Sequence, residues 1–478
     1  MKRSRIAGIF LLIYLICNSC AKNPVTGKRD FMLLSEGQEV AMGQQSDPEI
    51  KSFFGVYEDP KLQQFINDKG QKMAAISHRS NLKYEFKIVD SPVVNAFAVP
   101  GGYVYFTRGI MAHFNNEAEF AGVLGHEIGH ITARHSAKQY SNAQLAQIGL
   151  IAGSVISPEF AQVAEYASAG VQLLFLKFGR DAESQSDKLG VEYSTKIGYD
   201  ADEMAGFFST LDRLSEGGGE VPTFLSTHPD PADRERKVSK EAANWKKKVT
   251  ASSLQVNRDQ YLRMIDGIVY GEDPKQGFVE NNVFYHPVLR FQFPVPSKWT
   301  LQNTPQQVQM GSSDGRALMI FTLAPGNSLE NAAQTLLQKY QLRAVDSGKD
   351  NVNGFPAIAI IADQQQQQQE SGVRTLVYVI QQGQNLYAMI GASALKDFNS
   401  YFQLFKSTIS GFNELRDQDK INRQPERVRV KTVAQSGTLQ QAFGKLNVPE
   451  KRMKELSILN GMELTDRVQQ GMLIKVIE

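Results

Sequence analysis

The sequence predicts an α+β protein in which a mostly helical first half precedes a second half rich in strands. Segments with helical periodicity dominate residues 60–214, and one short group of strand-like runs lies among them. In residues 280–415, strand-like runs surround two helical ones, which indicates a separate unit with a largely antiparallel sheet. A chain of 478 residues is long enough for two or three domains.

Composition and charge are those of an ordinary globular protein. There are 52 Lys and Arg residues against 50 Asp and Glu residues, which gives a net charge of +2, and no nucleic-acid partner is expected. The two cysteines, Cys17 and Cys20, both lie near the N-terminus, so the body of the chain has no internal disulfide.

Residues 1–19 resemble the signal peptide of a bacterial lipoprotein. A basic start is followed by an apolar stretch at residues 6–16, which is too short to span a bilayer comfortably. Cys20 stands where such signals are cleaved and lipidated. The resemblance implies a lipid anchor on Cys20 and a body on the periplasmic face of a membrane, with Ala21 favouring the outer membrane. Ordinary secretion and an uncleaved anchor are the alternatives.

Helices and strands are predicted in a definite order through the first half. Residues 21–50 read as a polar leader, and a helical pattern predicts a helix over residues 60–76. Residues 84–89 alternate like a strand, and residues 96–107 read as two strands joined by a Pro-Gly-Gly turn. An asparagine cap predicts a helix over residues 117–135.

Two apolar segments, residues 144–156 and 161–178, are helical in pattern, but each is shorter than a membrane span needs. We expect buried or interfacial helices there, with a transmembrane arrangement as the alternative. Further helices are predicted over residues 181–197 and 202–214, and three glycines at residues 217–219 mark a break.

The second half is predicted to hold five strands and two helices. The glutamine run at residues 364–369 separates two strands and is expected to be a hairpin tip. Charge and a proline mark residues 416–427 as a linker, and residues 428–478 form a last small module. The predicted strands are 289–295, 317–323, 357–362, 374–380 and 386–392, and the predicted helices are 329–340 and 395–409.

The segment His126-Glu127-Ile128-Gly129-His130 indicates the chemistry. Four residues of α-helix turn through about 400°, so the two imidazoles leave the helix on one face. Two neutral imidazoles at this spacing can hold a Zn²⁺ ion, and Glu127 can direct its carboxylate at water on the metal. A helix with two unrelated polar histidines is the alternative.

A catalytic zinc site needs a third protein ligand and one open position. Glu183 and Asp187 are one helical turn apart on a predicted helix and face the same way. We assign Glu183 as the third ligand and Asp187 as the acceptor of a hydrogen bond from a ligand histidine, which fixes the tautomer of that histidine. An exposed acidic helix face is the alternative.

Several separated motifs follow one another between residues 23 and 240. They are Asn23-Pro24-Val25-Thr26-Gly27, Asn95 to Gly102, His126 to His135, Glu183 to Asp187, and Thr227-His228-Pro229 with Arg234. This order resembles the HtpX-like zinc metallopeptidases, relatives of the CAAX prenyl endopeptidases, and within them the periplasmic, membrane-attached branch. The resemblance implies a mostly helical zincin-type, gluzincin-like domain with a small sheet. It implies one zinc ion bound by His126, His130 and Glu183, with Glu127 as general base.

Three further residues are expected near the metal. His228 is predicted to stabilise the oxyanion or, as the relatives suggest, to occupy the open zinc position and hold the resting enzyme inactive. An ordinary loop histidine is the alternative, and Arg234 is expected to steady the loop of His228. His135 lies nine residues after His126, half a turn away on the same predicted helix. We therefore expect His135 to support a ligand rather than to bind zinc.

Asn95, Ala96, Phe97 and Ala98 are predicted to hold the substrate. Peptidases of this kind bind a peptide as an extra strand at a sheet edge, through main-chain hydrogen bonds. The Pro-Gly-Gly turn that follows would keep this edge close to the metal. A purely structural hairpin is the alternative.

The two C-terminal regions resemble further known folds. Residues 280–415 resemble a PsbP-like α+β domain, and residues 428–478 resemble a LysM-like module, which implies contact with peptidoglycan. Docking to a protein is the alternative, because the module lacks a clean row of aromatic residues. The predicted boundaries are a signal peptide at 1–19, a zinc metallopeptidase domain at 20–255, a linker at 256–279, the PsbP-like domain at 280–415, a linker at 416–427 and the LysM-like module at 428–478.

The zinc motif predicts a zinc-dependent endopeptidase, and the family resemblance implies one of the bacterial cell envelope that cleaves misfolded or misassembled proteins. Its expected partners are polypeptide substrates and the outer-membrane assembly machinery. The alternative function is an envelope assembly factor or chaperone whose zinc site is structural or latent.

Overall fold

The computed structural model describes residues 20–147, 177–216, 223–228, 234–249, 254–364 and 372–478. The predicted signal peptide, most of the two apolar segments and the glutamine-rich hairpin tip lie outside these residues. Unit 1 consists of the residues up to Gly271 together with Glu426–Glu478, and unit 2 consists of Glu272–Pro425. No helix in this described part of the chain is long and apolar enough to cross a membrane.

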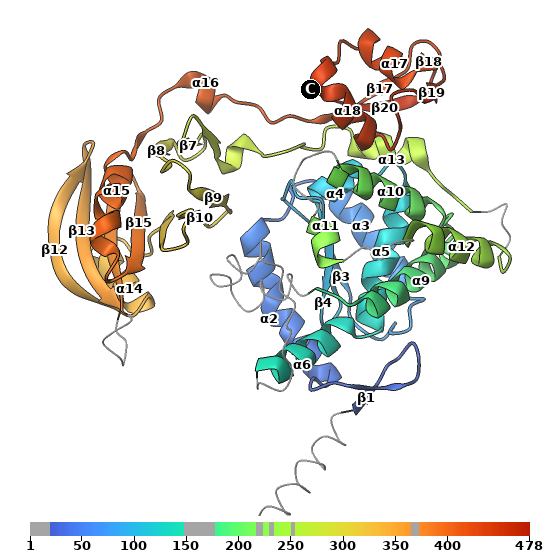
Figure 1. The fold of residues 1–478 in the computed structure, drawn as a ribbon, viewed down its shortest axis with the longest axis horizontal. Coiled ribbons are helices and arrows are strands. Elements are labelled where there is room, and N and C mark those ends of the chain that lie inside the picture. Colours follow the sequence, from blue (N-terminus) through green and yellow to red (C-terminus); the bar gives the residue numbers. More distant parts are fainter. Residues whose placement is uncertain (1–19, 148–176, 217–222, 229–233, 250–253, 365–371) are drawn as a thin grey trace, which may run out of the picture. The chain divides into compact units, whose positions relative to one another are not determined.

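A three-stranded sheet lies beside the helices of unit 1 (Figure 1). Its strand order is β3-β5-β4, with β3 parallel to β5 and β4 antiparallel to it. Val104 and Phe106 of β5 are fully buried and join the sheet to the main core. The predicted strands are confirmed, and they are β3 (Glu85–Val89), β4 (Ala96–Val99) and β5 (Tyr103–Thr107).

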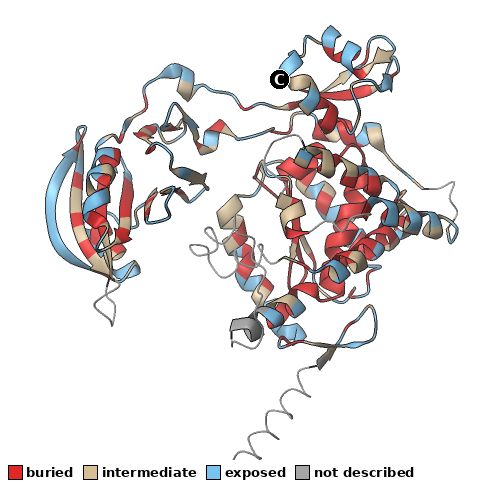
Figure 2. Ribbon diagram, in the orientation of Figure 1, coloured by how far each residue is buried: buried red, intermediate tan, exposed pale blue. Residues whose placement is uncertain are grey.

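Helix α5 (Glu117–Thr132) runs through the buried interior of unit 1, and every one of its residues is buried (Figure 2). Helix α9 (Arg180–Lys196) packs along it at very short range, because glycines meet where the two helices contact each other. A Cβ atom added to Gly125 would lie 2.9 Å from the Cα of Gly190. A larger residue at either position would therefore force the two helices apart.

Helix α5 ends earlier than predicted, so the helix expected over residues 117–135 is wrong at its C-terminus. The helix ends at Thr132, and Arg134 adopts the left-handed conformation, with φ of 60°. A right-handed helix cannot continue through such a residue. Helix α6 (His135–Gln147) begins directly afterwards. The nine-residue helical spacing predicted for its first residue therefore does not apply.

Both ends of α5 are capped, and the C-terminal cap comes from distant parts of the chain. Asn116 caps the N-terminal end. The side-chain amide of Asn23 donates a hydrogen bond to the carbonyl of Ala133 at 3.2 Å, and Arg79 donates to the carbonyl of Ile131 at 3.0 Å. These bonds satisfy carbonyl groups that a helix end leaves free. The motif that begins at Asn23 thus acts on the helix that carries the histidines.

The residues predicted as a polar leader are part of the fold of unit 1. Helix α2 begins after a capping box at Ser35, and its Glu39 is buried between the guanidinium groups of Arg79 and Arg134. The other elements before the C-terminal region are β1 (Cys20–Lys22), β2 (Arg29–Phe31), α2 (Glu36–Phe54), α3 (Pro60–Ala74), α4 (Arg108–His113), α10 (Glu203–Glu216), α11 (Thr223–Thr227) and α12 (Arg234–Lys246).

The region predicted as a linker, residues 256–279, contains a helix that belongs to the core of unit 1. Helix α13 (Arg258–Ile265) buries Tyr261 and Leu262, because its apolar residues lie on one face. Residues 428–478, the C-terminal module, share the same core through apolar side chains such as Phe443. The module consists of β17 (Val428–Thr432), β18 (Gly437–Thr438), α17 (Leu439–Lys445), α18 (Glu450–Leu459), β19 (Arg467–Val468) and β20 (Leu473–Ile477).

Unit 2 is built on a seven-stranded antiparallel sheet with the order β12-β13-β14-β15-β11-β10-β9. Val377 and Val379 of β14 pack with helix α14, whereas Leu376 and Tyr378 pack with helix α15, so one helix covers each face. The predicted strands and helices are confirmed to within a few residues. Strands β9, β10 and β12 of this sheet were not predicted, nor were β6, β7 and β16 of the second sheet described below.

The bounds of these elements are β9 (Thr300–Asn303), β10 (Gln307–Gly311), β11 (Ala317–Leu323), β12 (Leu342–Val352), β13 (Phe355–Gln364), β14 (Val373–Gln382), β15 (Asn385–Ala394), α14 (Leu329–Lys339) and α15 (Phe398–Ser410). A second sheet has the order β16-β8-β7-β6. Its strands are β6 (Phe278–Glu280), β7 (Val283–His286), β8 (Phe291–Pro294) and β16 (Asn413–Glu414).

Candidate metal centre

Helix α5 brings two imidazoles to one buried point. The Nε2 atoms of His126 and His130 lie 3.0 Å apart, and neither residue is exposed to solvent. Burial lowers the pKa of both imidazoles, that of His130 strongly, so both are neutral at pH 7. Two nitrogen atoms this close require a proton or a cation between them.

Glu183 of α9 lies on the other side of this point. Its Oε2 is 3.6 Å from Nε2 of His126, and its Oε1 is 3.4 Å from Nε2 of His130. Both oxygen atoms are buried and neither accepts a hydrogen bond, which is unfavourable for an ionised group. Burial accordingly raises the pKa of Glu183 well above its ordinary value. A divalent cation among the three groups would remove this penalty.

The donor set fits zinc. His126, His130, Glu183 and His228 each offer one ligand atom, and these four atoms lie within 4.8 Å of one another. Imidazole nitrogen and carboxylate oxygen are the usual ligands of Zn²⁺ outside thiolate sites. The three predicted ligands therefore lie together, and the fourth donor comes from His228.

Two neighbours set the orientation of His228. Its ring stacks on Phe224 with 4.5 Å between ring centroids, and its Nδ1 lies 3.0 Å from Oγ1 of Thr227 and 3.3 Å from the carbonyl of Phe224. A carbonyl oxygen only accepts, so Nδ1 carries the proton. Nε2 then offers a lone pair towards the cluster, where it has no hydrogen-bond partner and lies 3.7 Å from Oε1 of Glu127.

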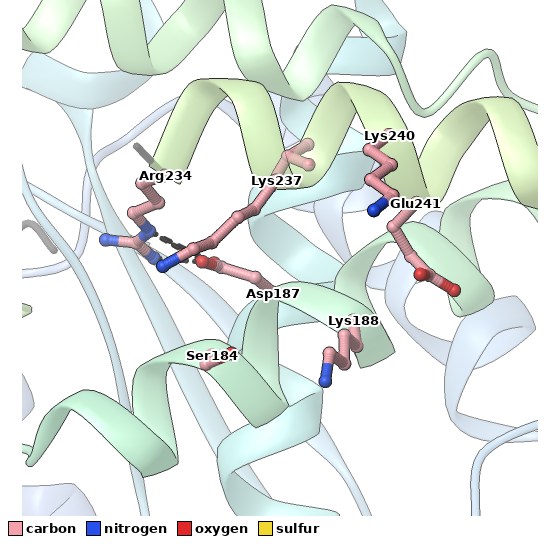
Figure 3. Close-up of a pocket in the computed structure, with 8 residues that line it drawn as sticks. Ser184, Asp187, Lys188, Arg234, Lys237, Lys240 and Glu241 are labelled. Atoms are coloured by element: carbon pink, nitrogen blue, oxygen red, sulfur yellow. Dashed lines mark hydrogen bonds and ion pairs between the residues drawn. The ribbon is translucent and has the colours of Figure 1, made fainter. Parts of the chain in front are cut away.

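Asp187 orients His126, and Arg234 orients Asp187. Nδ1 of His126 and Oδ1 of Asp187 are 2.9 Å apart, which directs Nε2 of His126 towards the cluster. Arg234 of α12 donates to Oδ1 of Asp187 on α9 at 2.7 Å, beside a cavity of about 300 Å³ (Figure 3). Burial opposes ionisation of Asp187, but Arg234 and the His126 bond outweigh it and lower the pKa of Asp187 to about 2.

Arg234 also contacts the third ligand. Its Nη2 lies 3.3 Å from Oε2 of Glu183, and its guanidinium carbon lies 4.1 Å from the ring centroid of Phe208. The structure thus places Arg234, predicted to steady the loop of His228, against the two carboxylates of α9.

His130 is held by groups from two other segments. Its Nδ1 lies 3.1 Å from Nδ1 of His135, and the ring of Phe178 packs on it with 4.1 Å between centroids. His135 also lies 3.1 Å from Oε1 of Gln185 through its Nε2. Burial lowers the pKa of His135 to about 4, so this imidazole is neutral and able to share one proton with His130.

Glu127 lies next to the cluster and does not belong to its ligand set. Its carboxylate is fully buried, and neither oxygen has a hydrogen-bond partner. Burial raises the pKa of Glu127 to about 8. In its ionised form, a carboxylate with a raised pKa accepts a proton more readily than one in water, which is the property that a general base needs.

The predicted substrate strand is the edge strand β4 with the residue before it. Ala96 to Val99 pair with β5 on one side, and the other edge of β4 has no strand partner among the residues described. Asn95 accepts a hydrogen bond from the amide of Thr107 through its carbonyl. The side chain of Phe97 points into a small apolar cluster rather than to solvent.

Comparison with known sequences identifies the family. Residues 60–242 match peptidase family M48. This range holds α5 and α9, and with them His126, Glu127, His130 and Glu183. Residues 60–242 of the chain therefore form an M48 peptidase domain. The predicted kinship with the HtpX-like zinc metallopeptidases is thereby confirmed.

Relatives of this M48 peptidase include bacterial and mitochondrial proteins. The beta-barrel assembly-enhancing protease of Yersinia pestis is 27% identical over 451 residues, which is 88% of this chain and 86% of that protein. The protein of the same name from Escherichia coli (strain K12) is 29% identical over 48% of each chain. The mitochondrial metalloendopeptidase OMA1 of Arabidopsis thaliana is 31% identical over 38% of this chain and 36% of its own.

Among solved structures, PsbP from Synechocystis sp. PCC 6803 aligns with 29% of this chain and 91% of its own. The identity is 12% and the TM-score is 0.23. The PsbP-like fold of residues 280–415 and the LysM-like fold of the C-terminal module stay predictions.

Two aromatic contacts of the M48 site were not predicted from the sequence. Phe224 stands four residues before His228, and this helical spacing was a signal that could have indicated the stacking. Phe178 lies in no recognisable pattern with His130, because the two residues come from segments far apart in the chain.

Replacing Asp187 by Asn should weaken zinc binding by about 10-fold to 100-fold. The amide keeps the shape of the side chain but loses the charge that orients and polarises His126. Competition with a chelator measures the affinity. Since the pKa of Asp187 is about 2, its carboxylate stays ionised above pH ~4, so the deficit should be equal at pH ~6 and pH ~8.

The matched control is Asp181→Asn, an exposed carboxylate in the first turn of the same helix. It should bind zinc as the wild type does. An Asp187→Asn variant with wild-type zinc affinity would contradict the assigned role.

Proposed function

We propose that this M48 peptidase is a zinc-dependent endopeptidase of the bacterial cell envelope that cleaves misfolded or misassembled proteins. The observation that carries the proposal is the buried convergence of His126, His130 and Glu183 with the unpartnered carboxylate of Glu127 beside them. The names of the relatives, a beta-barrel assembly-enhancing protease and a mitochondrial metalloendopeptidase, support protein substrates.

His126, His130 and Glu183 would hold one zinc ion, which, when bound, polarises a carbonyl group and lowers the pKa of water. Asp187 keeps His126 in the tautomer that presents Nε2. Glu127 takes the proton of the attacking water and later delivers it to the leaving amine. The dry surroundings that raise the pKa of Glu127 help it to hold this proton between the two transfers.

We further propose that substrate binds as an added strand along β4. A strand at the edge of a sheet offers main-chain donors and acceptors without regard to sequence. Such recognition suits an enzyme whose substrates share an unfolded, extended state rather than a sequence motif.

The location proposed for the enzyme is the periplasmic face of the outer membrane, through a lipid on Cys20. Strand β1 starts at Cys20 and pairs with β2, so such an anchor would join unit 1 without a long tether. The outer-membrane assembly machinery is the proposed partner, and a glycan contact through the C-terminal module is a further proposal.

The second candidate function is an assembly factor or chaperone with a latent zinc site. It is favoured by His228, whose Nε2 lies within 4.8 Å of the three ligand atoms and could close the site to water.

Glu127→Gln should lower the rate of casein cleavage by about 100-fold or more, because the amide keeps the shape but cannot accept a proton. The zinc content should stay that of the wild type. Glu235→Gln, exposed on α12, is the matched control and should cleave normally. If wild type and Glu127→Gln are equally inactive yet both rescue an envelope defect, the chaperone function replaces the peptidase.

His228→Ala separates the two roles of that residue. We expect about twofold or more faster basal cleavage, because Nε2 presents a lone pair and so competes for a ligand position. A fall of roughly 10-fold or more would instead assign His228 to the oxyanion. Initial rates at equal zinc content measure the effect, and unchanged rates would contradict both roles.

A further inference from the structure

The end of helix α4 is held by a side chain from the last strand of the protein. Lys475 of β20 donates hydrogen bonds through Nζ to the carbonyls of Ala112, His113 and Phe114, at 2.9, 3.3 and 3.0 Å. These carbonyls belong to the terminus of α4, where a helix leaves its acceptors without partners. They stand immediately before the cap of α5, so the bonds fix the point from which α5 begins.

Lys475 is fully buried, which is unusual for a lysine. A buried ammonium group is strongly unfavourable unless its donors are satisfied, and its three N–H groups here meet three carbonyls. Burial lowers the pKa of Lys475 to about 7, and the nearby carboxyl group of Glu119, in the first turn of α5, opposes this shift. An arrangement this complete indicates a specific contact rather than a lysine trapped by packing.

Two hydrogen bonds to Asn460 hold the backbone of Lys475. The backbone amide of Lys475 donates to Oδ1 of Asn460 at 2.8 Å, and the side-chain amide of Asn460 donates to the carbonyl of Lys475 at 2.8 Å. Strand β20, which carries the lysine, is therefore hydrogen-bonded to the C-terminal end of α18.

Two further contacts reach the connection between α4 and α5, one from helix α13 and one from the C-terminal module. The hydroxyl of Tyr261 on α13 donates to the carbonyl of Met111 at 2.7 Å. A Cβ atom added to Gly461 would lie 2.9 Å from Nδ2 of Asn115, so the module touches the connection between α4 and α5 directly.

We propose that Lys475 is a positioning residue of the peptidase and that the C-terminal module is an intramolecular part of the active enzyme. His126 lies ten residues, or about 15 Å along the axis of helix α5, from the N-cap residue Asn116. A shift of the N-terminal end of α5 therefore moves the proposed zinc ligands of this helix and Glu127 together. The inference rests on the proposed peptidase function for its kinetic readout and on zinc affinity for a second, independent one.

The test compares full-length wild type, Lys475→Met and Lys451→Met. Lys451 is an exposed lysine on α18 of the same module and serves as the matched control. We expect Lys475→Met to remain folded by circular dichroism, with kcat lowered by about 10-fold or more, KM little changed and zinc affinity reduced. Lys451→Met should match the wild type in all three.

The outcomes separate the two proposals. If wild type and Lys475→Met have equal kcat and equal zinc affinity, Lys475 has no positioning role. If the wild type does not cleave casein, the peptidase proposal fails, and the zinc affinities alone decide the role of Lys475.

Tyr261→Phe provides the test if Lys475→Met does not fold. It removes a single hydrogen bond to the same helix end, so a measurable fall in kcat supports the inference. A wild-type kcat together with wild-type zinc affinity in Tyr261→Phe would overturn the inference at its premise, that hydrogen bonds to the end of α4 set the position of α5.

Discussion

The site depends on the close approach of two helices. Gly125 of α5 and Gly190 of α9 meet almost backbone to backbone, and no side chain fits between them. This distance allows Glu183 and Asp187, one helical turn apart on α9, to reach the histidines of α5. Glycine in the middle of a helix is unfavourable by roughly 0.5–1 kcal/mol relative to alanine. Glycine is nevertheless required at both positions, because the side chains of α9 could not reach the histidines of α5 if the two helices were further apart.

The electrostatics of the site follow from its burial. Neither Glu127 nor Glu183 accepts a hydrogen bond, although Arg234 lies 3.3 Å from Glu183, whereas Asp187 accepts hydrogen bonds from Arg234 and His126. Burial therefore raises the pKa values of the first two, and the paired Asp187 stays ionised. The three acids differ in environment, which agrees with the roles proposed for them: a base for Glu127, a ligand for Glu183 and an orienting group for Asp187. A cation is the component that makes this arrangement favourable.

The sequence predicted what depends on short-range periodicity. His126 and His130 share a face because they are four residues apart, and the strands around the Pro-Gly-Gly turn alternate clearly. What it did not predict depends on long-range packing or on single backbone angles. Arg134 ends α5 through its left-handed conformation, and Phe178 meets His130 across the fold. Strand β12 was missed because most of its side chains are polar and exposed, so it lacks the buried alternation that marks a strand.

The contacts of α5 show why domain boundaries were hard to predict. Asn23 caps its C-terminal end, and Lys475 fixes the junction at its N-terminal end, although the two residues lie at opposite ends of the chain. Composition suggested a leader and a detached module. In the fold, both segments supply hydrogen-bond donors to carbonyl groups that lack partners inside the helices.

X-ray absorption at the zinc edge of the purified full-length chain tests the central claim most directly. The account predicts one zinc ion per chain with nitrogen and oxygen ligands only, at about 2.0–2.2 Å, of which at least two are imidazoles. Replacement of Glu183 by Gln should alter this spectrum. A chain that retains no zinc, or a zinc spectrum that is unchanged in Glu183→Gln, would contradict the account.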